Sequence, residues 1–246
     1  MQGVCRKRRS FTDIPRLDFR TAILLLMTLF FIQLMQPAFN SGDAQALIYW
    51  DNDSNSGNGF TWQNGGSDKG LFGEPTLING NKLRFLPQNF FAKSLNGKSA
   101  ITSDRLQVRI TADANEIIKG IRITEYGVYD INSTGKVIAG GYVVLTNLSL
   151  YETLRGTLLM DPNMPIPSTV KCSGEWDGSI LLEGFEWTDL QIVLNNNLTA
   201  KSSAGSQSYI DKTFFEIEII VPEPATLAIL AIGGAVLPLC KRSRHR

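Results

Sequence analysis

The stretch Leu106-Gln107-Val108-Arg109-Ile110-Thr111 alternates an apolar with a polar side chain at every step. A β-strand turns successive side chains to opposite faces of its sheet, so this alternation is typical of a strand with one buried face. The same period of two recurs at Phe215-Glu216-Ile217-Glu218-Ile219. Both stretches therefore predict half-buried β-strands.

Similar apolar runs follow one another through the middle of the chain. They cover residues 118–129, 136–149, 179–183 and 189–194, and the last strand is expected over 213–221. Turn-forming residues separate them at 132–135, 161–163 and 177–178. No long amphipathic helix pattern occurs between them. We expect an all-β fold, a single antiparallel β-sandwich that is jelly-roll-like and spans residues 47–221.

The N-terminal 46 residues have the features of a secretory signal peptide. Arg6-Lys7-Arg8-Arg9 precede an apolar run from Ala22 to Met35, which predicts a signal helix. The small-residue site Ala44-Gln45-Ala46 predicts cleavage after Ala46, with cleavage after Ala44 as the competing choice. Arg8-Arg9 leaves the twin-arginine export route open, and the long apolar run leaves a retained N-terminal anchor open.

Residues 222–246 contain three parts in a fixed order. Pro222-Glu223-Pro224 comes first, an uncharged apolar run from Leu227 to Cys240 follows, and the chain ends in a basic tail. The basic residues of the tail are Lys241, Arg242, Arg244 and Arg246. Such a run predicts a short transmembrane helix whose basic end stays on the cytoplasmic side. Because the run is shorter than the roughly 20 residues of a full span, it suits a temporary anchor.

This order of parts, from about residue 221 to residue 246, resembles the PEP-CTERM sorting signal of bacteria that produce exopolysaccharide. The resemblance implies that a membrane-bound exosortase recognises Pro222, Glu223 and Pro224 and processes the tail. It also implies export through the translocon, a stay in the inner membrane before processing, and a final place at the cell surface or in the extracellular matrix. It covers about a tenth of the chain and says nothing directly about the central domain.

The charge of the central part differs from that of the ends. The whole chain has 24 Lys and Arg residues against 23 Asp and Glu residues, but both ends are strongly basic. Residues 21–240 carry 14 basic and 21 acidic side chains, a net charge of −7. Nucleic acid requires a basic face, so the composition argues against it as a partner. A polysaccharide or a divalent cation remains compatible with this charge.

Histidine and cysteine usage restricts the chemistry of the domain. The single histidine, His245, lies in the basic tail, and Cys172 is the one cysteine between residues 47 and 221. A Ser-His-Asp or Cys-His catalytic site, a zinc site with histidine ligands and an internal disulfide therefore cannot be built there. Catalysis by paired carboxylates remains open, because it needs only Asp and Glu.

One polar loop has partial calcium-loop spacing. Asp51, Asp53 and Asn55 supply oxygen atoms at alternate positions and Gly57 follows. The glycine comes one position late and Trp62 stands where a bidentate glutamate would complete the loop, so an ordinary polar loop is the alternative. Calcium is the one cofactor that the sequence suggests.

Two acidic segments each carry a tryptophan. The first contains Glu175, Trp176 and Asp177, and the second contains Glu186, Trp187 and Asp189. If they meet at neighbouring strand ends, aromatic faces flanked by carboxylates would suit a sugar, either for binding or for glycosidase chemistry. The alternative is that the tryptophans belong to the core and the acids are solvated.

A further aromatic group, Trp50, Phe60, Trp62 and Phe72, lies in a Gly- and Asn-rich region. It predicts either a second sugar-binding platform or an N-terminal edge packed on the sandwich.

These observations favour an exported, non-enzymatic component of the bacterial cell surface or exopolysaccharide matrix. The alternative is a carbohydrate-binding module or a carbohydrate-active enzyme of the envelope. Similar tails occur on some ice-binding proteins, but the flat Thr-x-Thr rows that would order water are missing. The expected partners are an exosortase-type enzyme, the translocon, the inner membrane and an exopolysaccharide.

Overall fold

The computed structural model describes residues 46–51 and 55–222. The described residues belong to one compact unit that begins at Ala46. The expected signal helix and transmembrane helix, and the sorting segment from Glu223 onward, lie outside the described residues.

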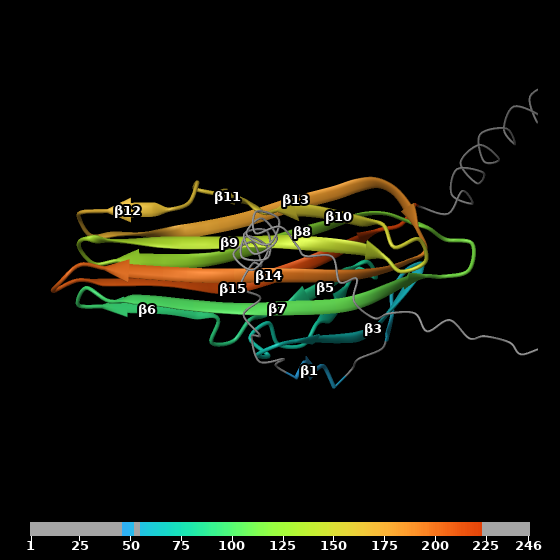
Figure 1. Ribbon diagram of the computed structural model, residues 1–246, viewed down its shortest axis with the longest axis horizontal. Coiled ribbons are helices and arrows are strands. Elements are labelled where there is room, and N and C mark those ends of the chain that lie inside the picture. The colour runs from blue at the N-terminus through green and yellow to red at the C-terminus, as the bar shows by residue number, and fades with distance from the viewer. Residues whose placement is uncertain (1–45, 52–54, 223–246) are drawn as a thin grey trace, which may run out of the picture. The chain divides into compact units, whose positions relative to one another are not determined.

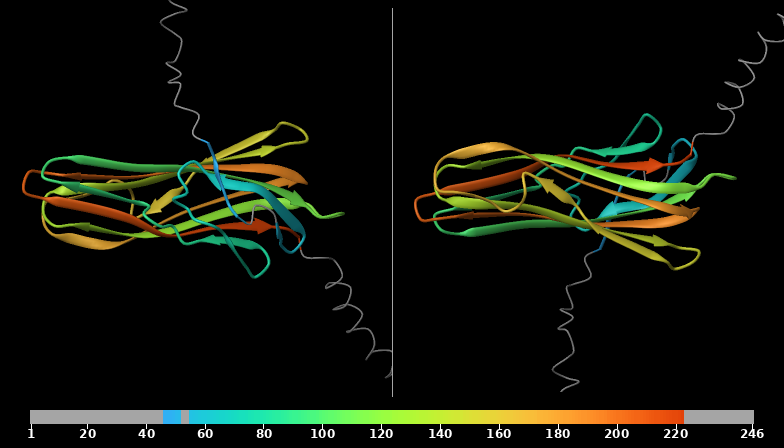
Figure 2. Two further views of the ribbon diagram at one scale, coloured as in Figure 1. Left: turned by 90° about the horizontal axis from the view of Figure 1, so that it is seen from below. Right: turned by 90° about the horizontal axis from the view of Figure 1, so that it is seen from above.

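Two antiparallel sheets pack face to face as a sandwich (Figure 1; Figure 2). Sheet A contains β1 (Ile48–Tyr49), β2 (Asn55–Ser56), β3 (Phe60–Ser67), β7 (Ser99–Ala112), β9 (Gly135–Asn147), β10 (Thr153–Thr157), β12 (Ile166–Ser168) and β14 (Asp189–Ser202). Sheet B contains β4 (Thr76–Ile78), β5 (Lys82–Phe85), β6 (Phe91–Leu95), β8 (Ile118–Ile131), β11 (Leu159–Asp161), β13 (Cys172–Trp187) and β15 (Gln207–Ile220). The predicted all-β sandwich is confirmed.

The strand order brings together segments that are far apart in sequence. Sheet A runs β1-β3-β7-β14-β9-β10, with β12 also on β9 and β2 on β3, and sheet B runs β11-β13-β8-β15-β5-β4, with β6 also on β15. The six long strands β7, β8, β9, β13, β14 and β15 alternate between the sheets in chain order. Each connection between them therefore crosses from one layer to the other, and the core lies between the layers.

The alternating stretches behave as their pattern predicts. In β7, Leu106, Val108 and Ile110 are fully buried between the sheets. In β15, Phe215, Ile217 and Ile219 are fully buried in the same way. Because each strand gives one face to the core, apolar burial drives the packing of sheet on sheet.

The last strand is longer than expected, since it begins at Gln207 and not at Thr213. Its register against β8 shifts between Lys212 and Phe214. A β-bulge of this kind interrupts the period of two. The alternation of buried and exposed residues before the bulge is therefore out of phase with the alternation after it. For this reason the sequence pattern predicted only the second part of the strand.

The turn expected at Asp177-Gly178 was wrong. Both residues lie inside β13, where Asp177 pairs with Tyr126 of β8 and Gly178 pairs with Glu125. A Cβ atom at Gly178 would meet the Met160 sulfur at 2.6 Å and Glu125 side-chain atoms at 3.0 Å. The glycine makes room for core side chains and does not turn the chain. The turns expected at 132–135 and 161–163 do separate strands.

Candidate functional site

The sandwich ends directly beside the expected sorting motif. Strand β15 ends at Ile220, and Pro222 follows two residues later. Pro222 is the last described residue, whereas Glu223, Pro224 and the basic residues 241–246 lie outside the described residues. The sorting residues therefore stay a prediction, but no separate linker lies between the last strand and the motif.

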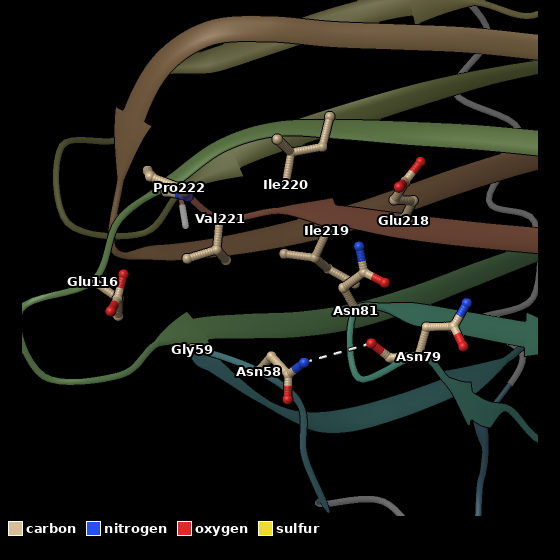
Figure 3. A pocket seen from close by; sticks show the side chains of 10 residues that line it. All are labelled: Asn58, Gly59, Asn79, Asn81, Glu116, Glu218, Ile219, Ile220, Val221 and Pro222. Atoms are coloured by element: carbon tan, nitrogen blue, oxygen red, sulfur yellow. Dashed lines mark hydrogen bonds between the residues drawn. The ribbon is translucent and has the colours of Figure 1, made fainter. Parts of the chain in front are cut away.

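A hollow of about 370 Å³ lies at this end of the domain (Figure 3). It is lined by Asn58, Gly59, Asn79, Asn81, Glu116, Glu218, Ile219, Ile220, Val221 and Pro222. The Asn58 side-chain amide donates to the Asn79 carbonyl at 3.4 Å, and Glu218 accepts from Arg122 at 2.9 Å. Within the part of the chain that the structure describes, no group of three or more His, Cys, Asp or Glu side chains is placed to hold a metal ion. The hollow is therefore lined by both polar and apolar residues and lies beside the last described residues of the chain.

Only part of the expected calcium loop is described. Asp53 lies outside the described residues, and Asp51 and Asn55 are exposed. The Asp51 amide donates to Glu74 Oε1 at 3.1 Å, and Asn55 Oδ1 accepts from the Ser56 amide at 2.8 Å. Binding of calcium at these three residues stays a prediction.

Trp176 lies in the core and not at the surface. Only 1% of its surface is exposed, and its indole Nε1 donates to the Asp211 carbonyl at 3.1 Å. Gly127 faces it across the β8–β13 pair, where a Cβ atom would meet the indole at 2.5 Å. The glycine opens the space that the indole fills. The expectation that Trp176 offers its ring to a sugar is corrected, because the core covers both faces of the ring.

The two acidic segments do not meet at neighbouring strand ends. Trp176 and Trp187 lie on the same strand, β13, eleven positions apart. At a rise of about 3.3 Å per residue, this separates them by roughly 35 Å. The expected convergence of the two segments was therefore wrong, and each segment has to be considered alone.

Trp187 and Glu186 line a second hollow, of about 640 Å³. The rings of Phe185 and Trp187 lie 4.4 Å apart with an angle of 33° between their planes. Glu186 is exposed and lies 3.6 Å from the Lys119 ammonium. The register of β13 against β8 shifts between Glu183 and Trp187, and Gly184 has a φ of +87° there. A β-bulge of this kind bends the strand. Trp187 is only 5% exposed, so it lines the hollow without offering an open ring face on which a sugar could stack.

Glu175 and Asp177 lie on the outer surface of sheet B, beside an aromatic residue that the sequence did not single out. Tyr126 is 47% exposed and pairs with Asp177 on one side and with Phe214 on the other. Its ring centroid lies 5.3 Å from that of Phe214. We call this surface, made by Tyr126, Val128, Glu175, Asp177 and Phe214, the Tyr126 face.

The Tyr126 face has the composition of a sugar-contacting surface. Sugar rings stack on exposed aromatic faces, and neighbouring carboxylates accept hydrogen bonds from their hydroxyl groups. The Arg84 guanidinium lies 5.2 Å from the Phe214 ring centroid and adds donors at the edge. In the sequence, Tyr126 occupies an outward-facing position of the strand predicted over 118–129. This was the signal for an exposed aromatic residue, and Tyr126 was not predicted as a site residue.

Asp189 is already engaged by a cation. Arg109 donates to its two carboxylate oxygens at 2.8 Å and 2.6 Å. The hydrogen bond to Asp189 raises the pKa of the Arg109 guanidinium above its usual value, against a smaller opposing effect of burial. This bidentate pair joins β7 to the start of β14 and gives Asp189 a structural role.

The second aromatic group packs inside the sandwich. Trp50, Phe60, Trp62 and Phe72 are all buried, at 5% exposure or less. Trp50 lies 5.3 Å from Phe85, measured between ring centroids. Of the two expectations for this group, the sugar-binding platform was wrong and the packed edge holds.

A group of three polar side chains in the core was not foreseen. Glu125 of β8 accepts from the Lys212 ammonium of β15 and, at 2.6 Å, from the Asn196 side-chain amide of β14. Lys212 and Glu125 are fully buried and Asn196 is 2% exposed. We call Glu125, Asn196 and Lys212 the core triad. All three occupy inward phases of alternating strands, which is a signal that the sequence contained.

Burial governs the electrostatics of this triad. Transfer out of water lowers the pKa of the Lys212 ammonium, and the neighbouring Glu125 carboxylate only partly opposes that effect. On the outer surface, the pKa of Glu216 behaves differently. Burial acts to raise it, but hydrogen bonds from Arg84 and Lys82 outweigh burial and lower the pKa below its usual value.

No helix occurs among residues 46–51 and 55–222, so none there is long and apolar enough to cross a bilayer.

Comparisons with known proteins give no family. No protein-family model matches the chain. No curated protein matches it in sequence. Among solved structures, it is similar to the CBM22-1–GH10 modules of a Clostridium thermocellum endo-1,4-β-D-xylanase with xylohexaose, at 12% identity and a TM-score of 0.23. That match covers 53% of this chain and 26% of the xylanase chain.

Two further similarities are to isolated carbohydrate-binding modules. A CBM61 module with β-1,4-galactotriose is 9% identical, with 69% of this chain and 97% of that chain covered and a TM-score of 0.21. A CBM22-1 xylan-binding domain from Paenibacillus barcinonensis is 12% identical, with 61% and 91% covered and a TM-score of 0.20. Similarity at this level identifies no relative of the chain.

Proposed function

We propose that the protein is an exported, non-enzymatic component of the bacterial cell surface or exopolysaccharide matrix, delivered by its C-terminal sorting signal. An exosortase-type enzyme would process the signal at Pro222-Glu223-Pro224 after the translocon has exported the chain. The short apolar run would hold the chain in the inner membrane until then. The proposal includes a jelly-roll-like topology. The six long strands alternate between the two sheets, so each connection between them crosses from one sheet to the other.

One observation carries this proposal. The sandwich occupies the described residues from Ala46 to Pro222, and its last strand, β15, ends two residues before Pro222. An enzyme that cuts at Pro222-Glu223-Pro224 would thus release the folded domain with almost no trailing chain. The sandwich would remain intact, because every strand among the described residues lies before the cut.

The test replaces Pro222-Glu223-Pro224 by three alanines in the full chain, expressed in a bacterium that carries an exosortase-type enzyme. The expected result is a protein that stays in the inner membrane at full mass, whereas the parent chain is shortened and released. Fractionation followed by mass measurement distinguishes the two. Normal release of the triple-alanine chain would end the sorting proposal.

A carbohydrate-binding role is the second candidate, and the Tyr126 face favours it. Tyr126, Phe214, Glu175 and Asp177 gather there on an open sheet surface, which suits an extended polysaccharide better than a small molecule. Binding of the released protein to a panel of bacterial exopolysaccharides tests this role. Tyr126→Ala is expected to weaken binding about tenfold, because one stacking contact is lost.

The matched control is Tyr142→Ala. Tyr142 is also an exposed tyrosine, at 50%, but it lies on β9 in the other sheet. Equal binding by the parent and Tyr126→Ala proteins would remove this role. Release of reducing sugars from the polysaccharide would contradict the non-enzymatic proposal and support carboxylate chemistry at Glu175 and Asp177.

A further inference from the structure

The core triad joins both layers of the sandwich. Asn196 comes from β14 in sheet A, whereas Glu125 and Lys212 come from β8 and β15 in sheet B. Asn196 shares the inward phase of β14 with Leu194 and Leu198, which are fully buried. Its side-chain amide therefore points across the interior toward sheet B.

One oxygen atom brings the amine and the amide together. Glu125 Oε2 accepts from the Lys212 ammonium and, at 2.6 Å, from Asn196 Nδ2. The two nitrogen atoms therefore lie no farther apart than the sum of two hydrogen-bond lengths. An amine held this close to a carboxamide needs only a small side-chain movement to reach its carbonyl carbon.

The amine is fully buried among aromatic rings, and Glu125 is its one hydrogen-bond partner among the described residues. The Lys212 Nζ atom lies 5.2 Å from the Phe90 ring centroid. The centroids of Phe72, Phe215 and Trp176 lie 5.7 to 5.8 Å away. Within the described residues, Glu125 Oε1 and Asn196 Oδ1 are buried without any hydrogen-bond partner. A charged pair with two unsatisfied acceptors is an unfavourable arrangement for a core.

We propose that Lys212 and Asn196 condense into an intramolecular isopeptide bond, with Glu125 carrying the proton between them. The Lys212 Nζ atom attacks Asn196 Cγ, a C–N bond forms, and the bond from Cγ to Nδ2 breaks. Ammonia leaves. The reaction is a transamidation, in which no atom is oxidised or reduced and no other reagent takes part.

The protons and charges balance within the triad. Glu125 first takes one proton from the Lys212 ammonium, which leaves a neutral amine and a neutral carboxylic acid. A half-turn of the Asn196 amide would bring Oδ1 against this acid, so that Glu125 donates to the carbonyl that is attacked. The tetrahedral intermediate then expels Nδ2 as ammonia, with a second amine proton passing through the carboxyl group. One amide, one protonated Glu125 and one ammonia replace the ammonium, the carboxylate and the carboxamide.

The core favours this direction of reaction. A desolvated lysine is more readily neutral, and only the neutral amine is a nucleophile. Lys212 has this environment, since burial lowers its pKa. The product removes both charges from an apolar interior and replaces the orphaned carboxamide by an amide, so the unfavourable burial of a charged pair disappears.

The bond would connect the last strand to the opposite sheet. Lys212 lies within β15, which leads into Val221 and Pro222, and Asn196 lies in the central strand of sheet A. A pull on the C-terminal end would then be resisted by a covalent bond as well as by strand pairing. This consequence rests on the proposed C-terminal sorting, whereas the bond itself does not.

The test is mass analysis of the full chain after folding, denaturation and trypsin digestion. Trypsin cuts after Lys171 and Lys201, so Asn196 lies in peptide 172–201 and Lys212 lies in the chain that begins at Ser202. With the bond, cleavage after Lys212 is blocked and the two peptides stay joined, with a mass deficit of about 17 Da for the lost ammonia. Without it, peptide 202–212 appears alone.

Matched variants assign the roles. Asn196→Asp is expected to give the same joined product with a deficit of about 18 Da, since water then leaves in place of ammonia. Glu125→Ala and Lys212→Met are expected to abolish the joined product. Asn197→Ala is the control, because Asn197 is the exposed neighbour on the same strand, and it is expected to keep the deficit.

The parent chain alone decides the proposal, whatever the folding of the variants. Recovery of unlinked peptide 202–212 from folded parent protein would overturn it. A link from Lys212 to peptide 123–136, which contains Glu125, would also overturn it, because the carboxylate would then be the acceptor and not the proton carrier.

Discussion

Three strands of sheet B, β8, β13 and β15, supply residues to both the core face and the outer face of the sheet, and residues next to each other in sequence go to opposite faces. Glu125, Trp176 and Lys212 point into the core. Tyr126 and Asp177, their direct neighbours, and Phe214 point outward to the Tyr126 face. Trp176 and Asp177 therefore cannot serve the same site, although the sequence places them side by side.

The two faces also treat charge differently. In the core, one carboxylate binds one ammonium among aromatic rings, and both side chains are fully buried. On the outer surface, Glu216 accepts from Lys82 at 3.0 Å and from Arg84 at 2.9 Å, with both cations partly exposed. Both partners of the core ion pair are fully buried, whereas at Glu216 the carboxylate is buried and solvent reaches only the two cations.

The largest effect is expected from breaking the core triad. Glu125→Ala leaves the Lys212 ammonium in the core without a carboxylate, and we expect the free energy of unfolding to fall by about 3–5 kcal/mol. Urea denaturation of the full chain measures this. Glu218→Ala is the control on the outer face, where loss of the Arg122 contact at 2.9 Å is expected to cost at most about 1 kcal/mol. Equal losses in the two variants would contradict the distinction between the faces.

A smaller loss is expected from filling the space beside Trp176. The Cβ atom of Gly127→Ala would lie 2.0 Å from the Asp211 carbonyl oxygen and 2.5 Å from the indole. Overpacking of this kind destabilises by about 1–3 kcal/mol. Gly140→Ala is the control, because its Cβ would meet the Asn197 side chain at an ordinary 3.5 Å. Thermal unfolding that is unchanged in Gly127→Ala would show that the indole can move aside.

Glu216 on the outer face is expected to contribute to the decrease in unfolding free energy at acid pH. Because the pKa of Glu216 is lowered in the folded state, its contribution is present above its ordinary value of 4.5 and is lost as the pH falls through the folded value. Glu216→Gln is therefore expected to flatten the fall in unfolding free energy below about pH 4.5. Urea midpoints from pH 2 to pH 7 measure it, with Glu175→Gln as the exposed control. If the unfolding free energy of Glu216→Gln falls with pH as steeply as that of the parent chain, other groups cause the loss of stability at acid pH.

The smallest effect on stability is expected at the Tyr126 face itself. Tyr126→Ala removes a half-exposed ring, and we expect the free energy of unfolding to change by no more than about 0.5 kcal/mol. The same variant is expected to lose about tenfold in polysaccharide binding, so stability and binding separate at this residue. A loss of stability as large as that of Gly127→Ala would make Tyr126 a packing residue.

The sequence predicted the strands well where the alternation was unbroken. The period of two in Leu106 to Thr111 and in Phe215 to Ile219 is a local property, and both stretches form the strands expected. It failed where a local signal had another cause. Gly178 resembles a turn residue but makes room for Glu125, and the bulge after Lys212 hides the first half of β15.

The candidate sites were predicted less well, because contact between strands is not a local property. The sequence singled out Glu175 and Asp177, and Asp177 pairs with an aromatic residue, but that residue is Tyr126 and not Trp176. Glu186 and Trp187 share a hollow, at the other end of the strand. The sequence signal for the core triad was the presence of polar residues at inward-facing positions of the alternating strands.

By itself, the sequence determined the all-β class of the central domain and its acidic charge. It also determined that a histidine-based or disulfide-based site is absent from residues 47–221. These conclusions depend only on composition and on the period of neighbouring residues. The tertiary structure alone decided which strands pair and which side chains meet. Glu125 contacts Asn196 across 71 positions of sequence because one sheet packs on the other, and it contacts Lys212 across 87 positions because β8 pairs with β15 in sheet B.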